Sequence, residues 1–191
     1  MRSLLIFGFL IFSFDHLQAQ DSTKGLDIKP AIGIVGSPFK PTVSLMITYP
    51  LTPRWSVATH SLLSFLPTSN TKERYIKTNY NYSAIQNIGI GYSLYGKKGR
   101  ASHTVRFMGG LKRMAFSETL ANPELDEEVT IDVRTIVPEY GVMYDFSLGR
   151  GRCRFATRLY LPFHPIQYYP KGTLNNLAYL EVGAGIKLKK K

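Results

Sequence analysis

The chain has 191 residues, a length typical of one domain, and its 24 Lys and Arg against 13 Asp and Glu give a formal net charge of +11. Its single cysteine, Cys153, excludes an internal disulfide. Beyond the N-terminal segment, no apolar run approaches the roughly 18 residues that a membrane-spanning helix needs, which excludes a helical membrane protein.

The N-terminal segment has the three parts of a secretory signal peptide. Arg2 supplies a positive charge, Leu4–Phe14 is an apolar stretch too short to span a bilayer, and Ala19 is the small residue before a cleavage site. No cysteine directly follows the apolar stretch, which excludes a bacterial lipoprotein signal. We therefore expect residues 1–19 to be a signal peptide and residues 20–191 to form one exported domain.

Eight later segments alternate apolar and polar residues at every second position. A helix would repeat its apolar residues at i+3 and i+4, so the period of two predicts strands. In chain order, we expect strands at Gly25–Val35, Thr42–Pro50, Arg54–Leu66, Ser83–Tyr95, Ser102–Phe116, Thr130–Ser147, Cys153–His164 and Asn176–Leu188.

The length and facing of these segments predict a membrane barrel. In the fourth segment, Ile88 and Ile90 share one face while Gly89 and Gly91 share the other, which suits a crowded polar interior. A ten-residue strand rises about 33 Å and, tilted by about 40°, covers roughly 25 Å, the height of the apolar band of outer-membrane barrels. We expect an all-β fold: an eight-stranded antiparallel transmembrane up-and-down β-barrel with its apolar face outward.

Short and long connections alternate along the chain. The short ones are Leu51–Pro53, Gly96–Arg100 and Leu148–Arg152, and the long ones are Ser37–Lys40, Leu66–Tyr82, Ser117–Val129 and Pro165–Asn175. The alternation predicts short periplasmic turns, longer extracellular loops and both termini on the periplasmic side. Aromatic residues beside the short turns predict a girdle at the lipid interface, formed by Tyr49, Trp55, Tyr92, Tyr95, Tyr144 and Phe146.

The signal ending in Ala19-Gln20, the eight alternating segments and the short turns resemble the small outer-membrane barrels of the OmpA/OmpX type. Within these, the chain resembles the PorT-like β-barrel families of Bacteroidetes-type bacteria. The resemblance is one of pattern over the whole exported region, and it implies a passive barrel, an adhesion surface or a secretion component. Many such barrels end in an aromatic residue, whereas this chain ends in Leu188 and three lysines.

Charged residues fall on the face that we assign to the lumen. The interior of an eight-stranded barrel is just wide enough for side chains, and a buried charge needs a partner. We expect an ion-pair network in which Glu139 and Glu181 meet Arg106 and Arg158. Such a network would plug the barrel or, as a sharper alternative, gate a narrow pore.

The sequence shows no constellation typical of catalysis, a metal site or a cofactor. His60 and Ser61 are adjacent, so a strand would turn them to opposite faces. The acidic residues Glu118, Glu124, Asp126, Glu127 and Glu128 lack the order of a calcium loop, and we interpret them as a solvated loop.

We expect an integral outer-membrane protein with a structural or interaction role through its extracellular loops and no catalytic activity. Its expected partners are outer-membrane lipids and envelope or secretion-complex proteins; no motif for nucleic acid is present. Three alternatives remain: a small porin-like channel, a lipid A-modifying outer-membrane enzyme, and a secreted lipocalin-like barrel with its apolar face inward.

Overall fold

The computed structural model describes residues 25–35, 40–66, 69–71, 76–96, 99–122, 127–149, 151–163 and 178–189. These residues form β1 (Gly25–Val35), β2 (Lys40–Pro50), β3 (Trp55–Leu66), β4 (Ser69–Thr71), β5 (Ile76–Tyr95), β6 (Ala101–Asn122), β7 (Glu127–Leu148), β8 (Cys153–Pro162) and β9 (Tyr179–Lys189). None of the described residues belongs to a helix long and apolar enough to cross a membrane. The predicted signal peptide, residues 1–19, lies outside the described residues.

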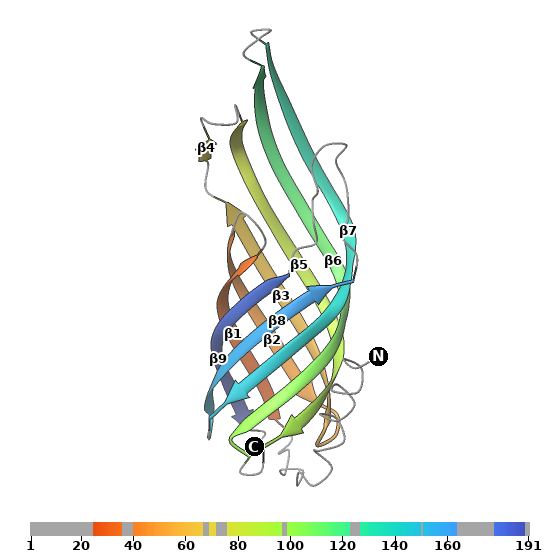
Figure 1. Cartoon of the computed structure of the whole chain (residues 1–191). Helices are drawn as coiled ribbons and strands as arrows, with labels where there is room; N and C mark the ends of the chain where they lie inside the picture. Colours follow the sequence, from red (N-terminus) through yellow and green to blue (C-terminus); the bar gives the residue numbers. More distant parts are fainter. Residues whose placement is uncertain are drawn as a thin grey trace, which may run out of the picture.

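Eight of these strands close into a barrel (Figure 1). Antiparallel neighbours follow the order β3-β2-β1-β9-β8-β7-β6-β5, and β3 also pairs with β5, which joins the two ends of the sheet. The short strand β4 pairs only with the beginning of β5 and adds to the ladder above the barrel. The predicted eight-stranded antiparallel barrel is confirmed, and β1 has the predicted bounds.

Each barrel strand has an apolar outward face. In β9, for example, Leu180 and Val182 are exposed, whereas Tyr179 and Glu181, which alternate with them in sequence, are buried. Every barrel strand contributes exposed aliphatic or aromatic side chains to a surface that we call the apolar belt, including Ile32, Leu45, Leu63, Ile88, Phe107, Ile136, Leu161 and Leu180. The apolar face therefore points away from the lumen, as the sequence predicts.

Tight turns join the strands at the lower end of the barrel in Figure 1. After β2, the amides of Leu51 and Thr52 donate to the carbonyl of Trp55 at 2.9 and 3.1 Å. Between β5 and β6, Gly99 has a φ of 59°, a conformation that a residue with a side chain rarely adopts. The beginning of β1 and the end of β9 pair at this same end, at Gly25 and Lys189.

The upper end differs from the prediction. β5, β6 and β7 contain 20, 22 and 22 residues, against 10 to 12 in the other barrel strands. The predicted loops Leu66–Tyr82 and Ser117–Val129 are wrong where these strands continue. Glu118 interrupts the apolar alternation between Phe116 and Leu120, whereas β-branched residues such as Thr119 and Val129 still favour extended backbone. We call residues 76–82, 115–122 and 127–134 the wall; they stand above the barrel (Figure 1).

Candidate functional site

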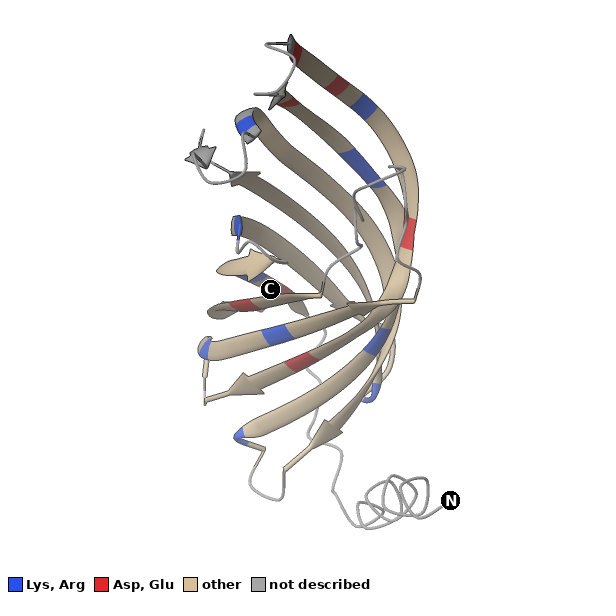
Figure 2. Cartoon of the chain, turned by 45° about the horizontal axis from the view of Figure 1, so that its top comes forward, with Lys and Arg blue, Asp and Glu red and all other residues tan. Residues whose placement is uncertain are grey.

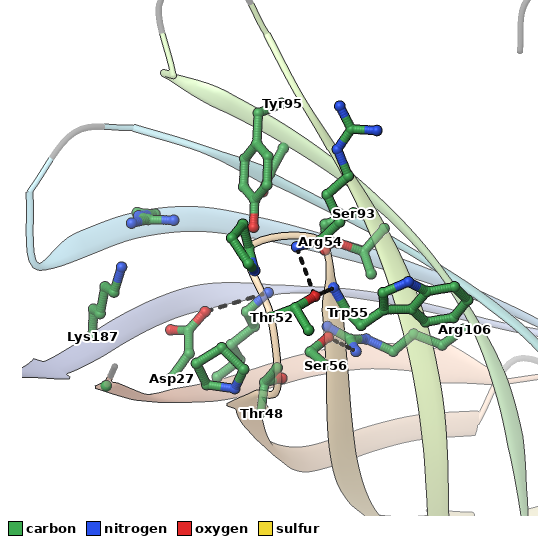
Figure 3. A pocket seen from close by; sticks show the side chains of 17 residues that line it. Asp27, Thr48, Thr52, Arg54, Trp55, Ser56, Ser93, Tyr95, Arg106 and Lys187 are labelled. Atoms are coloured by element: carbon green, nitrogen blue, oxygen red, sulfur yellow. Dashed lines mark hydrogen bonds and ion pairs between the residues drawn. The ribbon is translucent and has the colours of Figure 1, made fainter. Parts of the chain in front are cut away.

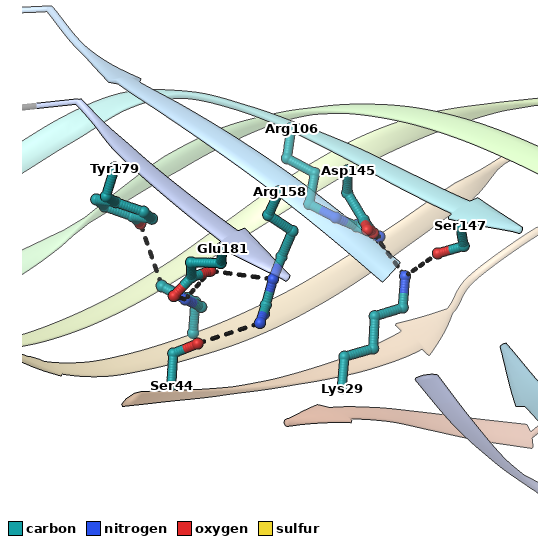
Figure 4. A network of polar contacts seen from close by, with 9 residues as sticks. Lys29, Ser44, Arg106, Asp145, Ser147, Arg158, Tyr179 and Glu181 are labelled. Carbon is teal, nitrogen blue, oxygen red and sulfur yellow. Dashed lines mark hydrogen bonds and ion pairs between the residues drawn. The ribbon is translucent and has the colours of Figure 1, made fainter. Parts of the chain in front are cut away.

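The lumen holds three clusters of charged side chains. In the first, Arg158 of β8 and Glu181 of β9 are register partners, and Nε of Arg158 lies 3.0 Å from a Glu181 carboxylate oxygen. Nε2 of His60 approaches that carboxylate at 3.2 Å, and the Tyr179 hydroxyl is hydrogen-bonded to Nδ1 of His60 at 3.2 Å. Arg158 also donates to Oγ of Ser44 at 3.1 Å (Figure 4). Side chains from four strands therefore form a hydrogen-bonded network that includes one buried carboxylate.

The second cluster surrounds Asp145, near the lower end of β7. Nζ of Lys29 donates to the Asp145 carboxylate at 2.6 Å and to Oγ of Ser147 at 3.0 Å. Nη2 of Arg106 lies 3.6 Å from the same carboxylate (Figure 4). Nη1 of Arg106 donates to Oγ of Ser56 at 2.7 Å (Figure 3). The Asp145 carboxylate therefore forms ion pairs with two cations.

The third cluster pairs Lys112 of β6 with Glu139 of β7, at 4.0 Å. The predicted network thus forms only at Arg158 and Glu181. Glu139 contacts Lys112 and Arg106 contacts Asp145, in place of the pairings that we expected. The register explains the difference, because these two pairs are diagonal neighbours on adjacent strands.

Lys29 and His60 are members that sequence reasoning missed. Alternation places both on the inward face, and that was the available signal. Their partners, however, are 116 positions away for Lys29 and Asp145, and 121 positions away for His60 and Glu181. Such contacts across the lumen depend on how the barrel closes, which strand alternation does not specify.

Apolar and aromatic side chains fill the lumen around these clusters. The rings of Tyr160 and Tyr179 stack with centroids 4.6 Å apart, and His60 stacks on Tyr179 at 5.6 Å. Met46 and Met143 are fully buried in the same core cluster. The described side chains therefore pack the lumen rather than lining an open channel.

Aromatic side chains gather on the outward face near the lower turns: Tyr49, Trp55, Tyr92, Tyr144 and Phe146. Trp55 and Tyr92 pack edge to face with centroids 5.1 Å apart. Tyr95 instead lines a cavity in the lower mouth of the lumen (Figure 3). It lies three positions after Tyr92, and an odd spacing puts two strand residues on opposite faces. The placement of Tyr95 in the girdle is therefore wrong.

The outward face of the wall carries what we call the tyrosine patch: Tyr80, Tyr82, Asp132 and Arg134. The Tyr80 hydroxyl donates to Oδ1 of Asp132 at 2.6 Å, and Nε of Arg134 lies 3.6 Å from that oxygen. The Arg134 guanidinium also sits over the Tyr80 ring, 6.0 Å from its centroid. Acidic and basic residues both occur on this upper part of the molecule (Figure 2).

One edge of the wall is covered by a strand, and the other edge has no strand partner among the described residues. β4 pairs with the beginning of β5, which covers the first edge. The pairing of β7 with β8 stops at Gly141, apart from one bond from the Phe163 amide to the Tyr140 carbonyl at 3.1 Å. Among the residues that the structure describes, β7 above Tyr140 pairs with β6 alone.

The structure separates the residues that could suggest hydrolysis. His60 is buried in the lumen, whereas Ser61 is exposed on the outward face and its hydroxyl donates to Gln86. Within the described ranges, no group of three or more His, Cys, Asp or Glu side chains is placed to hold a metal ion. Glu118 lies in β6, and Glu127 and Glu128 lie at the beginning of β7, not in the acidic loop where the sequence placed them. Glu124 and Asp126 lie outside the described residues.

No protein-family model matches the sequence, and no curated protein sequence matches it. Solved structures with a similar fold include neisserial surface protein A (NspA), with a TM-score of 0.51 and 12% identity over 87% of this chain and 96% of that one. The N-terminal β-barrel domain of Pseudomonas aeruginosa OprF has a TM-score of 0.50 and 11% identity, over 87% of this chain and 98% of that one. Ail, the attachment invasion locus protein of Yersinia pestis, has a TM-score of 0.50 and 9% identity, over 86% of this chain and 97% of that one. At these identities the likeness concerns the fold: this chain has the fold of small outer-membrane β-barrels.

Proposed function

We propose that the chain is an integral outer-membrane β-barrel protein that binds other molecules through its wall and has no catalytic activity. The apolar belt supports insertion, because Ile32, Phe107 and Ile136 are 69%, 62% and 63% exposed and soluble monomers rarely expose large apolar patches. An 11-residue strand such as β1, tilted by about 40°, covers roughly 28 Å, close to the apolar band of membrane barrels. A closed barrel also satisfies its backbone hydrogen bonds internally, as lipid requires.

The proposed orientation follows from the lengths of the connections. The short turns face the periplasm and the wall stands outside the cell, as in other membrane barrels of this kind. Residues 1–19 act as the signal peptide that exports the chain. Kinship with PorT-like barrels, which the Ala19-Gln20 junction and the strand pattern support, belongs to the same proposal.

The wall is the observation that carries the interaction role. A strand of 22 residues rises about 73 Å, roughly twice the rise of an 11-residue barrel strand. Tyr and Arg dominate binding hot spots, and the tyrosine patch places two tyrosines and one arginine on one face. Above Tyr140, the edge of β7 that has no strand partner among the described residues offers backbone donors and acceptors to an extended segment, which can bind by strand addition. We infer a partner protein of the envelope or the surroundings that presents such a segment.

Conduction finds less support. A channel needs continuous water, whereas Arg158, Tyr160, Tyr179 and Glu181 are each at most 1% exposed inside the lumen. The charged clusters act as a plug in this proposal. Single-channel recordings that show conductance, altered by Glu181→Gln, would favour the gate instead.

Cysteine labelling tests the orientation. In a Cys153→Ser background, Glu128→Cys places a thiol on the wall and Arg100→Cys places one in a lower turn, both at exposed positions. A maleimide that cannot cross the outer membrane should label Glu128→Cys on intact cells and Arg100→Cys only after permeabilisation. Equal labelling of both, or the reverse order, would contradict the proposal.

Photo-crosslinking tests the interaction role. A photoreactive side chain at Thr130, exposed on the wall, should give discrete protein adducts in the cells that make the chain. Tyr80→Ala together with Arg134→Ala should weaken these adducts about tenfold or more, the effect expected of hot-spot residues. The same photoreactive group at Phe107, in the apolar belt, is the matched control and should give no such adduct. Lipid adducts alone at Thr130 would overturn the interaction role.

A further inference from the structure

A cavity of about 80 Å³ opens in the lower mouth of the lumen (Figure 3). Asp27 and Lys187 stand at one side of it, and Arg106 with Ser56 stands at the other. The lining also includes Lys29, Arg154 and several hydroxyl side chains, among them Thr48, Ser93 and Thr104. Because one water occupies about 30 Å³ of liquid, the space suits two or three waters or one small oxyanion.

The charge around this cavity is unbalanced. Five cationic residues line it, Lys29, Arg54, Arg106, Arg154 and Lys187, and one carboxylate, Asp27, lies among them. Asp145 behind the lining is shared by Lys29 and Arg106, so five positive charges meet two negative ones. Elsewhere in the lumen the balance is closer, since Arg158 faces Glu181 and Lys112 faces Glu139. The positive surplus of the described lumen is thus concentrated at its lower mouth.

Hydrogen-bonding capacity is unused at the same place. Nε of Arg106, Nε of Arg154 and Oγ1 of Thr48 are buried and have no hydrogen-bond partner among the described residues. Arg106 is 2% exposed, so bulk water does not reach its guanidinium group in this conformation. A buried donor without a partner costs free energy, and an anion that accepted these hydrogen bonds would recover it.

We propose that the lower mouth of the lumen is a binding site for a phosphoryl group. Guanidinium groups match the oxygens of phosphate in geometry and charge, and the hydroxyl groups of the lining supply further donors. Arg154 and Arg106 bind the phosphoryl oxygens, and Lys187 adds charge at the rim. The site faces the periplasm, where the phosphoryl group comes either from a soluble phosphate compound or from the headgroup of an anionic phospholipid of the inner leaflet.

Calorimetric titration of the folded barrel tests the site, in a zwitterionic micelle free of phosphate. Inorganic phosphate and pyrophosphate should each bind saturably at one site. Arg154→Gln and Lys187→Gln should each weaken binding about tenfold or more, the effect of losing a charge-assisted hydrogen bond. Arg152→Gln is the matched control, because Arg152 is exposed in the adjacent turn and outside the cavity lining. Trp55, the only tryptophan of the chain, has its ring on the outward face against Tyr92 but borders the cavity beside Arg54 and Ser56, so its fluorescence gives a second readout.

Absence of saturable binding by both anions would overturn the proposal. An equal loss in Arg152→Gln and Arg154→Gln would also overturn it, because it would show diffuse attraction to a basic surface. Each variant is first checked for folding by its heat-dependent gel migration. Adding phosphatidylglycerol to the micelle then identifies the source: competition with phosphate indicates a lipid headgroup, and no competition indicates a soluble compound. These results are independent of the wall and of its partner.

Discussion

Glu181 lies buried between Arg158 and His60, with its carboxylate 3.0 and 3.2 Å from their nitrogens. Glu181→Gln leaves Arg158 buried without its counter-charge, so we expect the free energy of unfolding to fall by about 3–5 kcal/mol. Denaturant titration of the barrel in micelles measures the change. Glu181→Leu combined with Arg158→Met removes both charges and should recover most of the loss. Equal losses in the single and the double variant would show that the ion pair is not the cause.

Gly141 and Gly109 differ in the space that a side chain would find, so they form a matched pair for testing the packing of the lumen. A Cβ at Gly141 would overlap the Leu161 carbonyl oxygen and come within 2.8 Å of the Tyr160 ring, whereas a Cβ at Gly109 would meet nothing within 4 Å. We therefore expect Gly141→Val to abolish or strongly reduce the folded, heat-sensitive band on gels, and Gly109→Val to preserve it. A folded Gly141→Val barrel of unchanged stability would contradict the packing of the lumen described here.

Strands β6 and β7 each have one part in the barrel and one part in the wall. Ala115 and Arg134 are register partners, so residues 116–133 can be replaced by a two-residue Asn-Gly turn. The shortened protein should keep its heat-dependent gel shift and its denaturant midpoint, while crosslinks from a photoreactive group at Tyr82 should disappear. A shortened barrel that still forms the same adducts would show that the β6 and β7 parts of the wall are not the binding element.

The strands also show how much of the fold the sequence predicts. The bounds of β1 and the outward face of β9 follow from alternation, because the belt needs an apolar residue at every second position. In the wall part of β6, Glu118 interrupts the apolar alternation, so the same test ended β6 six residues early, at Phe116 instead of Asn122. In the lumen, alternation identified Arg106 and Glu139 as inward residues, but their partners depend on the register between strands, which one sequence does not contain.

The whole molecule consists of three layers along the barrel axis. The lower mouth carries a positive surplus around Arg154 and Lys187, the middle is packed by Tyr160 and Tyr179 inside the apolar belt, and the wall stands above. This order agrees with the proposed orientation, since charged and polar groups lie at both ends and the apolar outward surface lies between them.

The central claim is that the apolar belt is embedded in the outer membrane around a closed barrel. Gel migration of fractionated cells in SDS, with and without boiling, tests this claim most directly. A closed barrel holds its backbone hydrogen bonds within itself, so the unboiled protein should stay folded and migrate differently from the boiled protein. We expect this shift in the outer-membrane fraction. A protein found in the soluble periplasmic fraction, with the same migration before and after boiling, would contradict the account.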